Sequence, residues 1–230
     1  NTNENIRIHV KMNRLNLTQG FIASDKNNFN VTLGREGSDY SAAIFAYAIN
    51  AESLTIWKDV KGLLNGDPKY FKNTKLIKNI SYSEAIELAF YGASVIHPKT
   101  LQPVQKKEIP LYIKSFEKPN QKGTEINKNL DLSPKIPCYI FKNNMIFIKI
   151  FSLDFSFAID KNLSHIFKKI DEFKIKVDII QNSAISFSIC LFDKYNQIEN
   201  LVKSLEGKFK IDVYKNISLY TIRHFDEQAI

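Results

Sequence analysis

Residues 32–41 read TLGREGSDYS, and this stretch decides how the first half of the chain folds. Residues 29–33 predict a short strand, and residues 38–50 predict a helix that Ser38 would cap at its N-terminus. The helix is apolar on almost every side, which is typical of a buried helix. Two glycines lie in the loop before it, and the backbone N–H groups at a helix start attract anions. The stretch therefore predicts a strand–loop–helix unit that can bind an anionic ligand.

Arg35 lies inside this loop and offers a planar guanidinium group suited to a carboxylate or a phosphate. No Lys-Ser or Lys-Thr pair follows the glycines, so the loop is not a P-loop. An ordinary strand-to-helix connection with a capping serine and a surface arginine would show the same pattern. Residues 32–41 taken alone leave both interpretations open.

Composition narrows the class of protein. A chain of 230 residues with 44% hydrophobic content is long and apolar enough for one or two globular domains. No apolar run approaches the roughly 20 residues that cross a bilayer, and residues 1–16 lack the apolar centre of a signal peptide. Cys138 and Cys190 are too few for a disulfide framework, and both are predicted to be buried thiols. We expect a cytoplasmic protein that binds no membrane.

Strands and helices alternate after the glycine loop. Residues 54–60 and 110–115 predict strands, whereas Ser81 and Glu84 form a capping box that opens a helix ended by Gly92. This order predicts a mainly parallel α/β sheet. Trp57 lies among apolar neighbours and is predicted to be part of the core.

Residues 118–137 are polar, contain three prolines and a glycine, and are predicted to be connecting sequence. The pattern beyond them changes to two amphipathic helices between alternating strands. The predicted strands are 145–151, 177–181, 185–191, 209–213 and 219–222, with helices at 163–173 and 198–205. The order βαββαβ is that of a ferredoxin-like unit, a fold that does not by itself imply a function.

Residues 32–41 resemble the aspartokinase signature, usually written LGRGGSDYSA, with Glu36 in place of the first of its paired glycines. Residues 84–98, EAIELAFYGASVIHP, resemble the family's EAAEMATFGAKVLHP segment. Further matching segments follow in the expected order: Gly20–Ile22, Ile56–Gly62, Asp67–Pro68, Ile109–Pro110 and Gly123–Thr124. The similarity covers residues 18–127, and the ferredoxin-like unit then resembles the ACT repeats of aspartokinases.

The resemblance implies an α/β fold made of a three-layer αβα amino-acid-kinase C-lobe and a ferredoxin-like ACT region. It divides the chain into a connecting segment at 1–17, the C-lobe at 18–127, a linker at 128–137 and the ACT region at 138–230. Residues 1–17 contain no Lys-Phe-Gly-Gly-Thr segment, and the second ACT unit is incomplete. We therefore expect a catalytic domain truncated at its front and an ACT region truncated at its end.

The activity implied by the resemblance is aspartate kinase, the first step of lysine, threonine and methionine biosynthesis. ATP with Mg²⁺ donates its γ-phosphoryl group to the side-chain carboxylate of L-aspartate, and no metal site made of protein ligands alone is expected. Arg35 would grip a carboxylate of aspartate, and Ser38 would help to hold it. Asp39 would lie beside the phosphates and organise a lysine or the metal, so Arg35 and Asp39 are the predicted catalytic residues.

The nucleotide side departs from the family pattern at several positions. The residues expected to contact ATP are Lys58, Asp59, Leu64, Lys69, Ser94 and Val95. Lys58 stands where the family often has threonine, Leu64 replaces a tyrosine, Lys69 an arginine and Ser94 a lysine. Backbone contacts would survive these changes, whereas the side-chain contacts of Leu64 and Ser94 would not.

Regulation is expected in the ACT region. The resemblance places Ser152, Asp178 and Ser183 around a feedback amino acid, with lysine as the expected effector, between the ACT units of a homodimer. Asp178 would meet the ammonium group of the effector, although an aspartate that ends the preceding loop and stays solvated would fit the sequence nearly as well.

Two other functions compete with a kinase. A non-catalytic ACT-containing module could bind an amino acid and dimerise without catalysing a reaction. The net charge of +8 could also indicate nucleic-acid binding, but the lysines form no long block and the strands lack the aromatic RNA-binding pattern. We expect no nucleic-acid partner.

Overall fold

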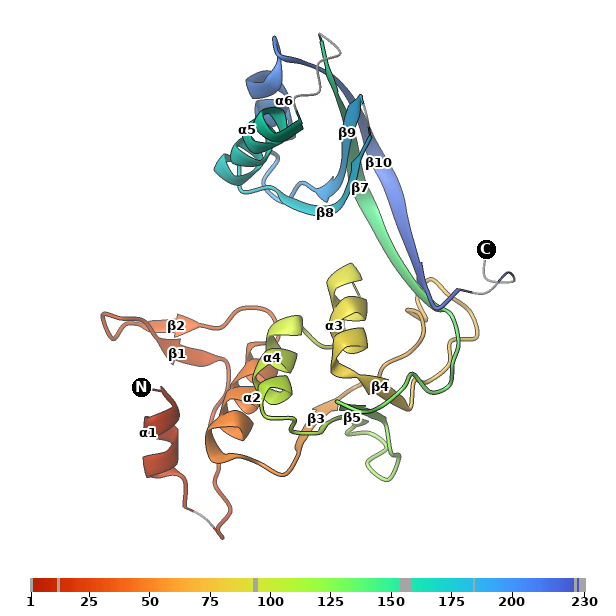
Figure 1. The fold of residues 1–230 in the computed structure, drawn as a ribbon. Helices are drawn as coiled ribbons and strands as arrows, with labels where there is room; N and C mark the ends of the chain where they lie inside the picture. The colour runs from red at the N-terminus through yellow and green to blue at the C-terminus, as the bar shows by residue number, and fades with distance from the viewer. Residues whose placement is uncertain are drawn as a thin grey trace. The chain divides into compact units, whose positions relative to one another are not determined.

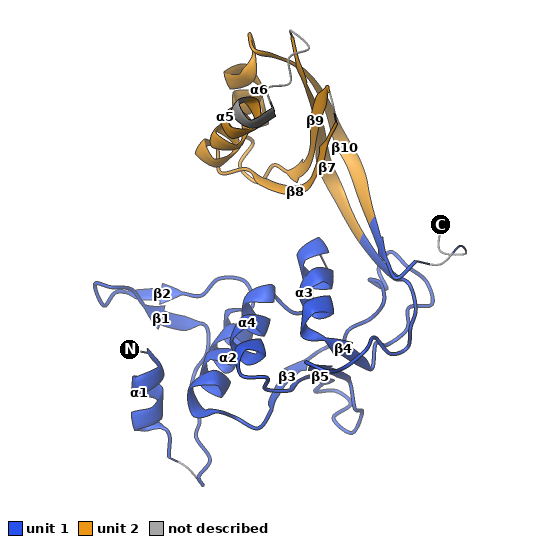
Figure 2. Cartoon of the chain, in the orientation of Figure 1, with its two compact units in different colours: residues 1–140, 221–230 blue, residues 141–220 orange. Residues whose placement is uncertain are grey.

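The structure is a computed structural model that describes residues 2–11, 13–92, 95–153, 159–183, 185–225 and 227 (Figure 1). The chain divides into two compact units, which consist of residues 1–140 with 221–230 and of residues 141–220 (Figure 2). No helix in the described ranges combines the length and the apolar character needed to cross a bilayer.

A four-stranded sheet organises the first unit. Its strands run in the order β3 (Leu54–Lys58), β5 (Leu111–Ser115), β6 (Thr124–Asn127) and β4 (Asn79–Ser81). β3 is parallel to β5 and β4 to β6, whereas β5 and β6 are antiparallel. The predicted mainly parallel sheet is therefore confirmed. The prediction of connecting sequence across 118–137 is wrong at β6, where Thr124 and Ile126 are completely buried.

Helices pack on one face of this sheet. α2 (Gly37–Ile49), α3 (Tyr82–Tyr91) and α4 (Pro98–Lys106) lie together on that face, while α1 (Thr2–His9) packs beside α2 (Figure 1). Ile56 of β3 points into the core and is 5% exposed, whereas the next residue, Trp57, is 49% exposed. Successive strand residues face opposite sides of a sheet, so the prediction that Trp57 belongs to the core is wrong. An antiparallel hairpin of β1 (Ile22–Ser24) and β2 (Asn30–Thr32) precedes α2.

The predicted helix starts agree with the structure in one case and disagree in the other. Ser81 caps α3, because its Oγ accepts a hydrogen bond from Glu84 N at 3.2 Å, and Gly92 ends that helix with φ 123°. The predicted cap at Ser38 is wrong: α2 begins at Gly37, and Glu36 occupies the N-cap position without a side-chain cap bond.

The second unit has the predicted βαββαβ order. Its elements are β7 (Cys138–Ser152), α5 (Ile159–Glu172), β8 (Lys176–Asn182), β9 (Ser186–Phe192), α6 (Ile198–Leu205) and β10 (Phe209–Arg223). The first three residues of β7 and the last three of β10 belong to the first unit. The strand order is β10-β7-β9-β8, and β9 is antiparallel to both of its neighbours. The ferredoxin-like prediction is therefore confirmed. The two strands predicted at 209–213 and 219–222 form the single strand β10.

Both cysteines are buried as predicted, with Cys138 at 1% and Cys190 at 4% exposure. Burial raises the pKa of Cys138 to about 11, so this thiol is protonated at neutral pH. Each unit has its own apolar core. The core of the second unit consists mainly of Ile148, Ile150, Ile166, Phe187, Ile189, Leu191, Ile198, Leu201 and Leu205.

Candidate functional site

The loop between β2 and α2 needs glycine at position 37. A Cβ atom there would lie 2.7 Å from Cδ2 of Phe21 and 3.0 Å from Cβ of Leu33. The preceding Glu36 adopts the left-handed conformation with φ 55°, which turns the chain sharply into the helix. The loop therefore brings the first turn of α2 against the start of the β1–β2 hairpin.

Ser41 fixes this arrangement, a role that we did not predict from the sequence. Its hydroxyl accepts a hydrogen bond from Phe21 N at 2.9 Å and donates one to Gly37 O at 3.0 Å. The residue is only 7% exposed, so both hydrogen bonds are shielded from water. A serine one turn into a buried helix was the available signal.

Asp39 and Lys58 form an ion pair beside the loop. Asp39 lies in the first turn of α2, and Lys58 is the last residue of β3. Lys58 Nζ lies 2.8 Å from Asp39 Oδ2, and the side chains are 19% and 16% exposed. Oδ2 is buried and has no other partner among the described residues. The structure thus joins two residues that the sequence assigned separately, one as catalytic and one as ATP-binding.

Two other polar side chains of the loop face solvent. Arg35 and Ser38 are both exposed, so each is accessible to a ligand. Glu36 is half-buried, and its Oε2 atom is buried with no hydrogen-bond partner in the described part of the chain. A guanidinium group, an ammonium group and a helix N-terminus thus occur together, which favours an anion at this position.

The loop that follows β3 is held to β6 by Thr124. Thr124 Oγ1 accepts a hydrogen bond from Leu63 N at 2.8 Å and donates one to Ile77 O at 2.6 Å. Gly62 has φ 140°, and a Cβ atom there would lie 2.6 Å from Thr124 Oγ1. The close approach of loop and strand therefore requires glycine at 62, and Thr124 gives this loop a fixed position.

The remaining residues predicted to contact ATP are spread over this loop and beyond it. Asp59 and Lys69 are exposed, and Lys69 Nζ lies 5.4 Å from the centre of the Tyr70 ring. Leu64 is half-buried and forms an antiparallel bridge with Leu76. Val95 is half-buried against the core of the first unit, and Ser94 lies outside the described residues.

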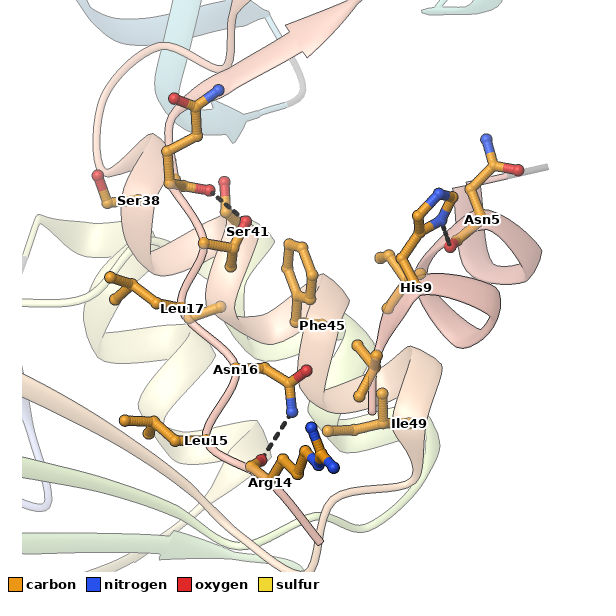
Figure 3. Close-up of a pocket in the computed structure, with 16 residues that line it drawn as sticks. Asn5, His9, Arg14, Leu15, Asn16, Leu17, Ser38, Ser41, Phe45 and Ile49 are labelled. Atoms are coloured by element: carbon orange, nitrogen blue, oxygen red, sulfur yellow. Dashed lines mark hydrogen bonds between the residues drawn. The ribbon is translucent and has the colours of Figure 1, made fainter. Parts of the chain in front are cut away.

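A cavity of about 760 Å³ lies between α1, residues 14–20 and α2. Figure 3 shows Phe45 and Ile49 of α2 between α1 and the extended residues 14–20. Ser38 and Ser41 line this cavity, whereas Arg35, Asp39 and the described residues among those predicted to contact ATP do not. The cavity therefore borders the predicted aspartate-binding residue Ser38 but does not contain the Asp39–Lys58 pair.

The three residues predicted to bind an effector lie on strands of the second unit or next to them. Asp178 of β8 accepts a hydrogen bond from the ammonium group of Lys142 of β7. The exposed Ser183 follows β8, and its hydroxyl lies 2.8 Å from that of Ser186. Ser152 ends β7 and is half-buried.

An arginine in the first unit holds α3. Arg223 Nε and Nη2 donate to the two carboxylate oxygens of Glu84 at 2.7 and 2.9 Å, and Nη1 donates to Glu87 at 3.2 Å. His224 Nε2 lies 2.8 Å from Glu84. The hydrogen bonds from Arg223 are the main reason that the pKa of Glu84 lies below its usual value. In the part of the chain that the structure describes, no cluster of three metal-ligating side chains occurs.

Comparison with known proteins identifies the fold family. The model of the amino acid kinase family matches residues 1–115, which are half of the chain. The chain belongs to the amino acid kinase family. Among its relatives, lysine-sensitive aspartokinase 3 of Escherichia coli K12 is 34% identical over 175 residues, which are 76% of this chain and 39% of that protein.

Solved structures of this family have the same fold. The structure of E. coli aspartokinase III in complex with aspartate and ADP has a TM-score of 0.74 and 30% identity, and the match covers 88% of this chain and 46% of that one. The structure in complex with lysine and aspartate has a TM-score of 0.72 at the same identity and coverage. The chain thus spans less than half the length of these proteins.

Proposed function

We propose that the chain is part of an aspartate kinase, which transfers the γ-phosphoryl group of ATP to the side-chain carboxylate of L-aspartate. The Asp39–Lys58 ion pair at the start of α2 carries this proposal, because it fixes a cation beside an anion-binding helix terminus. The complex of E. coli aspartokinase III with aspartate and ADP supports the choice of substrates.

Each residue has a defined task in the proposed reaction. Arg35 holds a carboxylate of aspartate through two parallel hydrogen bonds, with help from the hydroxyl of Ser38. Lys58, oriented by Asp39, neutralises charge on the phosphates, which is the principal protein contribution to such transfers. A side-chain oxygen of aspartate then forms a bond to the γ-phosphorus while the bond to the β–γ bridging oxygen breaks, and ADP leaves with that electron pair.

The adenosine would bind along the loop after β3. Asp59, Leu64 and Lys69 belong to this loop or follow it, and Ser94 and Val95 complete the proposed contacts. The hydroxyl of Thr124 holds the same loop through its hydrogen bond from Leu63 N. Thr124 would therefore contribute to nucleotide binding without contacting the nucleotide.

Mg²⁺ is proposed as the accompanying metal. The carboxylate oxygen Oε2 of Glu36, buried without a hydrogen-bond partner among the described residues, is the kind of ligand that Mg²⁺ takes together with substrate phosphates. When bound, the ion would neutralise charge that develops on the phosphates. Asp39, in the first turn of α2, provides a second carboxylate near the proposed ion.

We propose that the second unit, which is ferredoxin-like, exerts feedback control. The same unit would hold two copies of the chain together in a homodimer. Lysine is the expected effector, since the related aspartokinase 3 is lysine-sensitive and a lysine complex of aspartokinase III is known. Ser152, Asp178 and Ser183 are the proposed contacts. Sedimentation of the chain at increasing concentration tests the dimer, and a constant monomer mass would contradict it.

The decisive experiment measures aspartate-dependent release of ADP by the complete protein with every segment that its gene encodes. We expect turnover in the usual kinase range of about 1–100 s⁻¹ with L-aspartate. A protein that binds lysine but releases no ADP would instead be the non-catalytic regulatory module. Glutamate serves as the control substrate, because its side chain differs by one methylene group.

A further inference from the structure

Asp178 occupies an irregular position in β8. Val177 pairs with Leu191 of β9, and Ile179 pairs with Cys190, the next residue along β9. Asp178 is therefore the extra residue of a β-bulge. Bulges redirect a side chain and are frequent beside functional sites. The carboxylate of Asp178 contacts Lys142, while its neighbours Val177 and Ile179 stay paired to β9.

The carboxylate of Asp178 already forms an ion pair with the ammonium group of Lys142. Lys142 lies on β7 and Asp178 on β8, and β9 lies between these two strands. Lys142 lies four residues before Ile146, where the pairing of β7 with β9 begins, and its ammonium group reaches Asp178 from there. The side chains are 23% and 9% exposed, so water and salt screen the pair only weakly.

Cys190 of the intervening strand lies close enough to sense both charges. The thiol is 4% exposed. Burial is the main cause of its raised pKa, followed by the negative charge of Asp178, while the positive charge of Lys142 acts in the opposite direction. The ion pair therefore lies over a buried, uncharged residue, where an unpaired carboxylate would be costly.

We propose that Lys142 is a built-in occupant of the ammonium-binding position at Asp178, so that a free amino acid must displace it to bind there. The inference rests on the proposed function only in assigning an amino-acid effector to the second unit. The affinity for any effector falls to the fraction of molecules in which the pair is open. Lys142 thereby sets the effector concentration at which the protein responds.

Isothermal titration of the complete protein, with every segment that its gene encodes, with L-lysine tests this inference. Lys142→Met removes the occupant and should bind lysine at least about tenfold more tightly than the wild type, which corresponds to a pair closed nine-tenths of the time. Lys149→Met is the matched control, since Lys149 lies on the same strand with its ammonium group 5.8 Å from the Phe147 ring. Its affinity should equal that of the wild type. The double variant Lys142→Met/Asp178→Asn should lose the gain.

Lys142→Ala replaces Lys142→Met if the latter fails to fold, because alanine also removes the ammonium group and cannot donate a hydrogen bond to Asp178. Unchanged affinity in the folded Lys142 variant would overturn the inference. So would a gain that persists in the double variant. Failure of the kinase assay would leave these binding results unchanged. The proposed kinase activity and the proposed role of Lys142 can therefore be refuted independently.

Discussion

Replacement of Thr124 by valine removes a hydroxyl that connects three parts of the first unit. Thr124 is completely buried, and its Oγ1 bonds both Leu63 N and Ile77 O. Valine has nearly the same shape, so the change creates no cavity. It leaves one backbone N–H group and one C=O group buried without partners.

The expected loss of stability follows from these two groups. An unsatisfied buried polar group costs about 1–3 kcal/mol, and relaxation of the loop would relieve part of this cost. We therefore expect the free energy of unfolding of the first unit to fall by about 2–3 kcal/mol. A domain of this size loses about 2–4 °C in Tm for each kcal/mol, so its Tm should fall by roughly 4–12 °C.

Differential scanning calorimetry of the 230-residue chain measures this shift, and Thr32→Val on the exposed strand β2 is the control. The affinity for ADP, measured by titration calorimetry, should also fall, because the loop with Asp59 and Leu64 loses its support. A Tm within about 1 °C of the control variant would refute the role that we assign to Thr124.

Three further predictions concern activity and pH. In the complete protein, Arg35→Ala should lower kcat/KM for aspartate by roughly ten- to a hundredfold, the equivalent of about 1.5–3 kcal/mol, with little change in KM for ATP. Arg35→Lys should recover only part of this loss, and steady-state kinetics that match the wild type in both variants would remove Arg35 from the site. Residues 1–230 alone should release no ADP in a coupled assay. The reason is that the match covers only 46% of the aspartokinase III chain whose structure contains aspartate and ADP. Measurable turnover by residues 1–230 would contradict this prediction. Because Arg223 lowers the pKa of Glu84, their contact stabilises the fold above the usual glutamate pKa of about 4.3 and is lost as pH falls through the lowered value. The Tm difference between the wild type and Arg223→Gln should therefore be largest near neutral pH and shrink as the pH falls below the usual glutamate value, and a difference independent of pH would show that Glu84 is not responsible.

The sequence predicted the elements that depend on local patterns. The capped helix α3 follows from Ser81 and Gly92, which act on the backbone within a few residues. The ferredoxin-like unit follows from apolar spacing, since the same residues that alternate in β9 are buried under α5 and α6. In both cases the signal and the structure lie in the same short segment.

Long-range geometry explains what the sequence did not predict. β6 is a four-residue strand in which polar residues alternate with Thr124 and Ile126, and only its place between β5 and β4 reveals it as core. Trp57 has apolar neighbours in sequence, yet the helices of the first unit cover the opposite face of β3. The contact between Lys58 and Asp39 depends on the relative position of β3 and α2, which no spacing along the chain encodes.

Glu84 illustrates how a tertiary contact changes the role of a residue that a local motif identifies. The Ser81–Glu84 spacing predicts that the glutamate side chain turns back to the N-cap backbone, which is the second half of a capping box. Ser81 makes its half of the motif, but the carboxylate of Glu84 instead accepts two hydrogen bonds from Arg223, which lies 139 residues further along the chain. A two-pronged contact to a guanidinium group is stronger than a single bond from a backbone N–H, so the distant partner prevails. The motif therefore predicts where α3 begins, whereas the long-range contact decides what its glutamate binds.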